Sequence, residues 1–146
     1  PSNLKVWGFF FFQFSHLYNR SCTMKKESDL FKILKKNTPK ILWTRLESWV
    51  SFGVSDCLGY HDSCGFLCVE LKLIKNEKQK KVIFSPHQRL WALTHTKRNY
   101  ILLGTNVPRS IILYESKNIN GLLTNYHDTP YLAKNDWAEI NRLLIQ

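Results

Sequence analysis

A strand-like segment in which two charged residues stand among apolar ones constrains this chain more than any other feature. It covers residues 66–73. Because side chains alternate along a strand, Glu70 and Lys72 share one face, and the other face is wholly apolar (Leu67, Val69, Leu71 and Leu73). Burying a carboxylate and an ammonium costs free energy unless the two groups are paired or used. The segment therefore predicts a buried strand that carries a functional site.

Asp56 is the second acidic residue of this candidate site. It lies 14 residues before Glu70, at the start of a strand predicted over 54–60. If the two strands pair as a hairpin, Asp56 lies beside Glu70 and Lys72. Two converging carboxylates repel each other unless a cation lies between them, and their hard oxygen atoms suit Mg²⁺ or Mn²⁺. With a lysine alongside, such a site can hydrolyse a phosphodiester: the metal activates water and polarises the phosphate, and the ammonium steadies the developing charge.

The rest of the chain alternates helix and strand patterns without repeats. Helices are predicted over 25–36, from Ser85 to about Arg98 and from Asp136 onward, and further strands over 66–74, 100–103 and 110–114. Ser85 fits the N-cap of its helix, the following proline suits the first position, and Gln88 closes a capping box. Segment 41–50 fits either a strand or a helix. The order predicts an α/β fold with a mixed sheet flanked by helices.

The charge of the chain points to a polyanionic partner. The 146 residues include 21 Lys and Arg against 11 Asp and Glu, a net charge of +10. A small domain this basic usually binds nucleic acid, and less often an anionic membrane surface. The loop after the candidate strand carries four lysines placed to contact phosphates: Lys75, Lys78, Lys80 and Lys81.

Residues 1–23 differ from the remainder. They hold five of the nine phenylalanines, no acidic residue, and an apolar run far too short to span a bilayer. Met24, the only methionine, opens an ordinary-looking segment. We interpret residues 1–23 as a non-native upstream extension and 24–146 as one domain; the alternative is a genuine N-terminal strand that covers an apolar patch.

The cysteines favour a reducing compartment. Four of them, irregularly spaced, are too few for a disulfide framework in a chain of this size. His61, Cys64 and Cys68 lack the second ligand pair that a structural zinc site needs. We therefore expect a cytoplasmic protein, in the host cell cytoplasm if it is encoded by a phage, with no membrane partner.

The ordered set of these motifs resembles the PD-(D/E)XK nuclease superfamily. Asp56 followed by Glu70-Leu71-Lys72 matches its motif, with Ser55 standing where the name-giving proline would be. Segments 43–47 and 85–88 are similar to the VRR-NUC and archaeal-type Holliday-junction-resolvase branch, which includes small phage proteins. The resemblance covers about residues 24–114.

The resemblance implies a restriction-endonuclease-like core with the order αβββαβ. It further implies an endonuclease that depends on Mg²⁺ or Mn²⁺, acts on branched DNA and forms a homodimer. The implied catalytic residues are Glu47, Asp56, Glu70, Lys72 and Gln88, and the implied metal ligands are Asp56, Glu70 and Leu71. Arg45 joins the loop lysines as a DNA contact.

Three alternatives to this interpretation remain open. The chain could be an inactive DNA-binding protein of nuclease fold, a nuclease for flap or linear duplex DNA, or a protein whose basic faces meet a lipid surface or another partner. Two residues also have ordinary explanations, because Glu47 could be a plain exposed residue and Gln88 could serve only the helix cap.

A chain that begins at Met24 is expected to be as stable, and as active on DNA, as the 146-residue chain. The reason is that the predicted helices, strands and site residues all lie within 24–146. Melting temperatures and cleavage rates of the two chains check this. A loss of several degrees on truncation would show instead that the Phe-rich segment packs on the domain.

Overall fold

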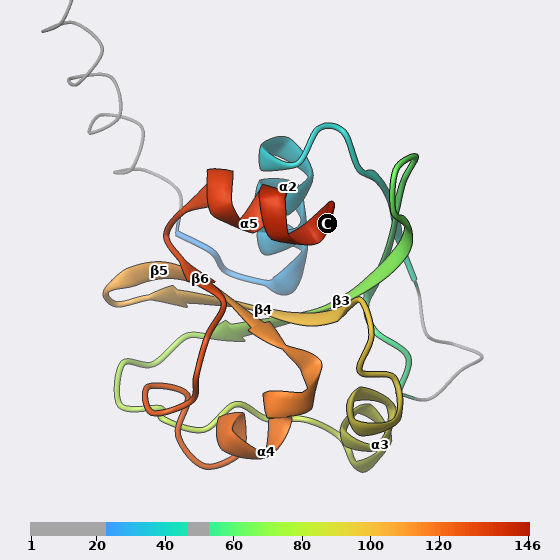
Figure 1. Ribbon diagram of the computed structural model, residues 1–146. Helices are drawn as coiled ribbons and strands as arrows, with labels where there is room; N and C mark the ends of the chain where they lie inside the picture. Colours follow the sequence, from blue (N-terminus) through green and yellow to red (C-terminus); the bar gives the residue numbers. More distant parts are fainter. Residues whose placement is uncertain (1–22, 47–52) are drawn as a thin grey trace, which may run out of the picture.

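The computed structural model describes residues 23–46 and 53–146, which form one mixed sheet with helices on both faces (Figure 1). The six strands are β1 (Leu42–Arg45), β2 (Cys57–His61), β3 (Gly65–Ile74), β4 (Asn99–Asn106), β5 (Arg109–Glu115) and β6 (Ala133–Lys134). The described helices are α2 (Glu27–Asn37), α3 (Pro86–Thr94), α4 (Ile119–Leu122) and α5 (Trp137–Leu144), with a 3₁₀ turn at Ser116–Asn118. The predicted α/β class with a mixed sheet flanked by helices is confirmed.

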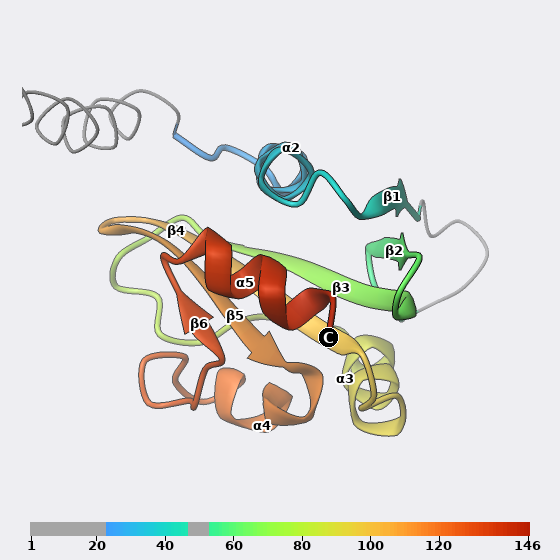
Figure 2. The same cartoon turned by 45° about the horizontal axis from the view of Figure 1, so that its top comes forward.

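The strands lie in the sheet in the order in which they occur in the chain. β3 and β4 are parallel and are joined through α3, whereas every other neighbouring pair is antiparallel. Figure 2 shows β1 and β2 at one side of the sheet and β6 at the other. The parallel pair therefore occupies the middle of the sheet, where both faces can be covered.

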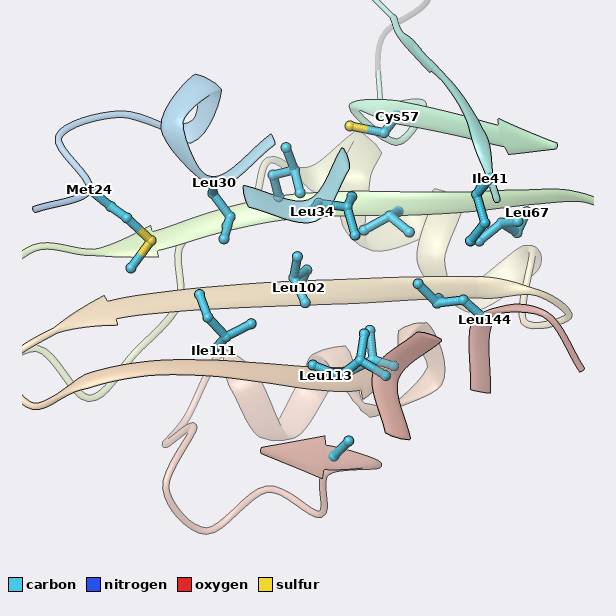
Figure 3. Packing of buried hydrophobic residues seen from close by; sticks show 14 residues of the cluster. Met24, Leu30, Leu34, Ile41, Cys57, Leu67, Leu102, Ile111, Leu113 and Leu144 are labelled. Atoms are coloured by element: carbon cyan, nitrogen blue, oxygen red, sulfur yellow. The ribbon is translucent and has the colours of Figure 1, made fainter. Parts of the chain in front are cut away.

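Two apolar clusters fill the space between the sheet and its helices. Figure 1 shows α2 and α5 on one face and α3 and α4 on the other. On β4, Leu102 packs in the α2–α5 cluster, whereas Ile101 and Leu103 pack in the α3–α4 cluster. Figure 3 shows Leu34 of α2 and Leu113 of β5 near Leu102. Burial on both faces explains why the sequence of this strand is a nearly continuous apolar run.

β3 is longer than the strand beside it, and this leaves part of one edge open. β2 pairs only with residues 65–69 of β3, while β4 pairs with residues 68–74 on the other side. Over 70–74, β3 therefore has no partner strand on its β2 side among the described residues. The predicted alternation is confirmed, since Leu67, Val69 and Leu71 are buried in the α2–α5 cluster and Leu73 packs against it.

Two predicted boundaries are wrong for local reasons. The strand predicted over 54–60 begins only at Cys57, because Gly53 turns the chain at φ +88° and the Asp56 side chain bonds to β3 in place of a backbone ladder. The helix predicted to reach Arg98 ends at Thr94, and Arg98 itself has a φ of +51°, which a right-handed helix cannot contain. Segment 41–50 begins as β1, and residues 47–52 lie outside the described part.

The described helices are all short. The longest, α2, has 11 residues, whereas a membrane span takes about 20. Within 23–46 and 53–146, no helix has the length and apolar character that crossing a bilayer requires.

Candidate active site

Asp56 lies at the open edge of β3, just before β2 begins. Its Oδ2 accepts a hydrogen bond from the main-chain N–H of Leu71 at 3.0 Å. The carboxylate thus takes the place that a neighbouring strand would occupy, one residue from Glu70. This contact brings the two acidic residues of the motif together, as the hairpin interpretation predicted.

Glu70, Lys72 and Gln88 form a hydrogen-bonded triangle on the α3 side of β3. The ammonium of Lys72 lies 3.0 Å from Glu70 Oε1 and donates to Gln88 Oε1 at 3.2 Å. Gln88 Nε2 donates to the same Glu70 oxygen at 2.5 Å. Since Glu70 is only 5% exposed, these two donors compensate for much of the water that its carboxylate has lost.

Gln88 makes hydrogen bonds both to the cap of α3 and to the charged residues of the candidate site. The side-chain Oε1 of Gln88 accepts a hydrogen bond from the main-chain N–H of Ser85 at 3.0 Å, and the main-chain N–H of Gln88 donates to Ser85 Oγ at 3.1 Å. These two bonds close the predicted capping box of α3. The same side chain contacts Glu70 and Lys72. The start of α3 is therefore held directly against the two charged residues of β3.

Glu70 is a buried carboxyl with other carboxylates nearby. Its pKa is raised from an ordinary value of 4.5 to about 7, chiefly by burial and then by the nearby Asp56 carboxylate, against the opposing effect of Lys72. Glu27 adds to the upward shift of the pKa. Negative groups that disfavour each other's ionisation in this way are suited to share a cation.

Glu27 is an acidic residue of the site that sequence reasoning missed. It lies in the first turn of α2, and burial raises its pKa; Lys72 lowers that pKa, whereas Asp56 raises it. The helix therefore brings a third carboxylate within electrostatic reach of the motif residues. No sequence signal marks Glu27, because acidic residues are common in first helical turns, where they favour the helix dipole.

The predicted acidic residue Glu47 lies outside the described residues. Leu71 is another predicted ligand. Its side chain is buried in the core and its main-chain N–H donates to Asp56, so its main-chain carbonyl oxygen is the atom that could bind a metal.

The donor set around Asp56 and Glu70 fits Mg²⁺ or Mn²⁺. No group of three or more His, Cys, Asp or Glu side chains lies close enough to hold an ion within the described ranges. Mg²⁺ does not need one, since it is commonly held by one or two carboxylates together with water and substrate phosphate. A cation here would offset the contributions by which Asp56 and Glu27 raise the pKa of Glu70.

Two further basic residues, Arg45 and Lys75, lie within electrostatic reach of Glu27. An open groove beside Lys72 is lined by Glu27, Lys75 and Ile83 among others. Arg45 and Lys75 lower the pKa of Glu27, which places both cations within its electrostatic reach. The other predicted DNA contacts, Lys78, Lys80 and Lys81, are exposed in the same loop. The structure thus gathers Arg45 and Lys75 at the carboxylates and leaves the remaining lysines on the adjacent surface.

Comparisons with models of known protein families, with curated proteins and with solved structures found no match for this chain.

The stability of the metal-free protein is expected to fall between about pH 4.5 and pH 7. The folded protein retains the Glu70 proton up to about pH 7, whereas the unfolded chain releases it near 4.5. The stabilising contribution of this group is therefore complete below pH 4.5 and lost as the pH rises through about 7. Glu70→Gln removes the titration and should flatten the fall in melting temperature.

Glu139→Gln is the matched control for this measurement. The pKa of Glu139 is lowered by its hydrogen bond with Arg142, so Glu139 titrates below the window in question. Its variant should keep the slope of the unaltered protein. Equal slopes in Glu70→Gln and the unaltered protein would contradict the assignment of this pH dependence to Glu70.

Proposed function

We propose that this chain is a metal-dependent DNA endonuclease of the PD-(D/E)XK kind, with branched DNA as its substrate. The observation that carries the proposal is the convergence of Asp56, Glu70 and Lys72 at the open edge of β3. These are the three residues that the motif resemblance assigns to metal binding and catalysis. Their order in the chain and their contacts in space agree.

The arrangement of the elements also supports the proposal. From α2 to β4 the chain runs helix, three strands, helix, strand, in the order that a restriction-endonuclease-like core requires. The strand with the ExK residues is central, and it is parallel to the strand that follows α3. The remaining elements, from β5 to α5, extend this core and complete the two apolar clusters.

The proposed reaction is hydrolysis of a phosphodiester by water, which adds oxygen to phosphorus and breaks one phosphorus–oxygen ester bond. Lys72 is placed to hold the attacking water or to stabilise charge on the phosphate oxygens. Gln88 orients Lys72 and Glu70 through its two side-chain hydrogen bonds. Asp56 and Glu70 would hold the cation, with Glu27 adding negative charge nearby. Bound Mg²⁺ or Mn²⁺ would supply Lewis acidity toward the phosphate and make a water more acidic.

Replacing Asp56 by Asn, or Glu70 by Gln, is expected to lower DNA cleavage by orders of magnitude. Each change removes a negative ligand from the proposed cation site. Affinity for DNA without metal should hold or rise slightly, because repulsion between carboxylate and phosphate also disappears. Single-turnover cleavage of a four-way junction, a flap and a linear duplex, with and without Mg²⁺, measures both effects on the same variants.

Two further sets of variants make this experiment decisive. Lys72→Ala should abolish most cleavage and weaken binding only modestly, whereas Lys80→Ala and Lys81→Ala should weaken binding and leave turnover of bound DNA nearly intact. Glu139→Gln is the charge-matched control, because Glu139 forms its own ion pair with Arg142 on α5. Parental cleavage by Asp56→Asn and Glu70→Gln would rule out a PD-(D/E)XK active site. Binding of DNA without any metal-dependent cleavage would favour the alternative of an inactive DNA-binding protein.

A homodimer is part of the proposal, because symmetric cleavage of two strands at a junction needs two active sites. One aliphatic surface on α3 suits such contact: Leu90 is 63% exposed and Leu93 40%. Both leucines line a groove with Phe84 and Leu123. The charged residue in this groove, Arg89, donates its Nε hydrogen to Asn120. On a chain with a net charge of +10, a surface with so little charge is where two copies repel each other least.

Light scattering is expected to give the mass of two chains at micromolar concentration, and Leu90→Lys should give the mass of one. The introduced charge cannot be buried against an apolar partner surface without a large cost. Val107→Lys is the matched control, since Val107 is 53% exposed in the turn between β4 and β5. A monomer mass for the unaltered protein, even with junction DNA, would favour a flap- or nick-directed enzyme.

A further inference from the structure

A second apolar surface lies on the sheet itself, on the face that carries Glu70 and Lys72. Leu42, Tyr60 and Phe66 lie opposite one another on β1, β2 and β3. Phe66 is 64% exposed and Leu42 69%, and Tyr60 between them is half-buried. Because β3 side chains alternate, Phe66 shares its face with Glu70.

This surface is aromatic, in contrast to the aliphatic surface on α3. The rings of Tyr60 and Phe66 are 5.0 Å apart between centroids and tilted by 55°. The next row along the strands contains Thr44, Leu58 and Cys68, which carry no charge. We call the residues Leu42, Tyr60 and Phe66 the aromatic row.

The backbone beneath the aromatic row is held in place on several sides. Arg98 Nε donates to the main-chain carbonyl of Phe66 at 3.0 Å. On the other face of β2, Gly59 lies so close to Trp43 and Ile41 that a Cβ there would be 2.8 Å from the Trp43 ring. A backbone fixed in this way lowers the ordering cost of binding a ligand on the rings.

The charges around the aromatic row suit an anionic ligand. The strand segments 42–45, 57–61 and 65–69 contain no acidic residue, and the exposed acid next to them is Asp62, in the turn between β2 and β3. Two exposed cations stand beside the segments in the chain: Lys40 two residues before Leu42, and Lys97 next to Arg98. An aromatic surface bordered by cations combines the two features by which proteins bind unpaired nucleotides, namely stacking of bases on rings and attraction of phosphates.

We propose that the aromatic row binds unpaired nucleotides of the substrate, with a base stacked on Phe66. Glu70 is four positions after Phe66, which is about 13 Å along a strand. An unpaired strand of a few nucleotides therefore reaches from the ring to the carboxylates. The link to cleavage rests on the proposed nuclease function and selects, within it, DNA that is unpaired next to the cut. Bases inside a duplex are already paired and stacked, so they gain nothing from Phe66.

Binding without metal tests the stacking directly and does not depend on cleavage. Fluorescence anisotropy is measured with a labelled single strand of about 12 nucleotides and with a duplex of the same length. Phe66→Ala is expected to weaken single-strand binding about tenfold, within the range for loss of one stacked base, and to leave duplex binding unchanged. Tyr131→Ala is the control, because Tyr131 is similarly exposed, at 55%, but lies outside the aromatic row.

Phe66→Leu separates stacking from simple apolar contact. Leucine keeps an apolar side chain but has no ring, so a stacking surface loses affinity for single strands, whereas an interface with a second copy of the chain tolerates the change. Phe66→Trp should retain the affinity. Single-strand binding unchanged in Phe66→Ala, or a dimer mass that becomes a monomer mass in that variant, would overturn the proposal.

The two hypotheses fail in different measurements. If the nuclease proposal is wrong, Asp56→Asn will cleave DNA at the same rate as the unaltered protein, while single-strand binding still depends on Phe66. Failure of the stacking proposal would appear in the anisotropy or in the mass of Phe66→Ala, with the cleavage defect of Asp56→Asn unchanged. Circular dichroism and melting temperature of each Phe66 variant establish that the sheet is intact; since the side chain is mostly exposed, the melting temperature should change little.

Discussion

The buried carboxylate of Glu70 is the constraint on which the arrangement of this protein depends. A carboxylate at 5% exposure needs strong donors, and Lys72 and Gln88 supply them. Gln88 can do so only because the capping box with Ser85 fixes the first turn of α3. The hydrogen bonds of this one buried group therefore connect β3 with α3, the helix that leads to β4.

The open edge of β3 is the second element that makes a site possible. If β2 continued alongside residues 70–74, its backbone would accept the N–H of Leu71, and the Asp56 carboxylate would lose this hydrogen bond. The chain instead turns at Gly53 and presents a side chain where a strand would lie. Because β2 is short, the Asp56 side chain reaches the open edge of β3 next to Glu70. Glu27 in the first turn of α2 is a third carboxylate within electrostatic reach.

The surfaces around the site differ in chemistry, and the proposed functions follow those differences. Lysines in the loop after β3 extend the positive charge away from the carboxylates. Leu90 and Leu93 give α3 an aliphatic surface with little charge, whereas the aromatic row on the sheet has rings and neighbouring cations. Aliphatic and aromatic surfaces favour different partners, because bases stack on rings and not on leucines.

The sequence by itself determined the parts of this protein that depend on local periodicity. The alternation in β3 separated Glu70 and Lys72 from the apolar face, and the capping residues located the start of α3 at Ser85. The hairpin interpretation also brought Asp56 to Glu70, because only a short turn separates their strands. Even so, the exact start of β2 escaped prediction, since a side-chain hydrogen bond replaced the expected backbone pairing.

Only the tertiary structure decided which distant groups meet. Glu27 resembles any acidic residue of a first helical turn until α2 packs across β3 and brings it near Lys72 and Asp56. The contacts of Gln88 likewise depend on where α3 begins, and the exposure of Phe66 depends on which part of the sheet the helices cover. Periodicity specifies which face of an element is apolar, but contacts between elements depend on how those faces pack, and a single sequence does not record the packing.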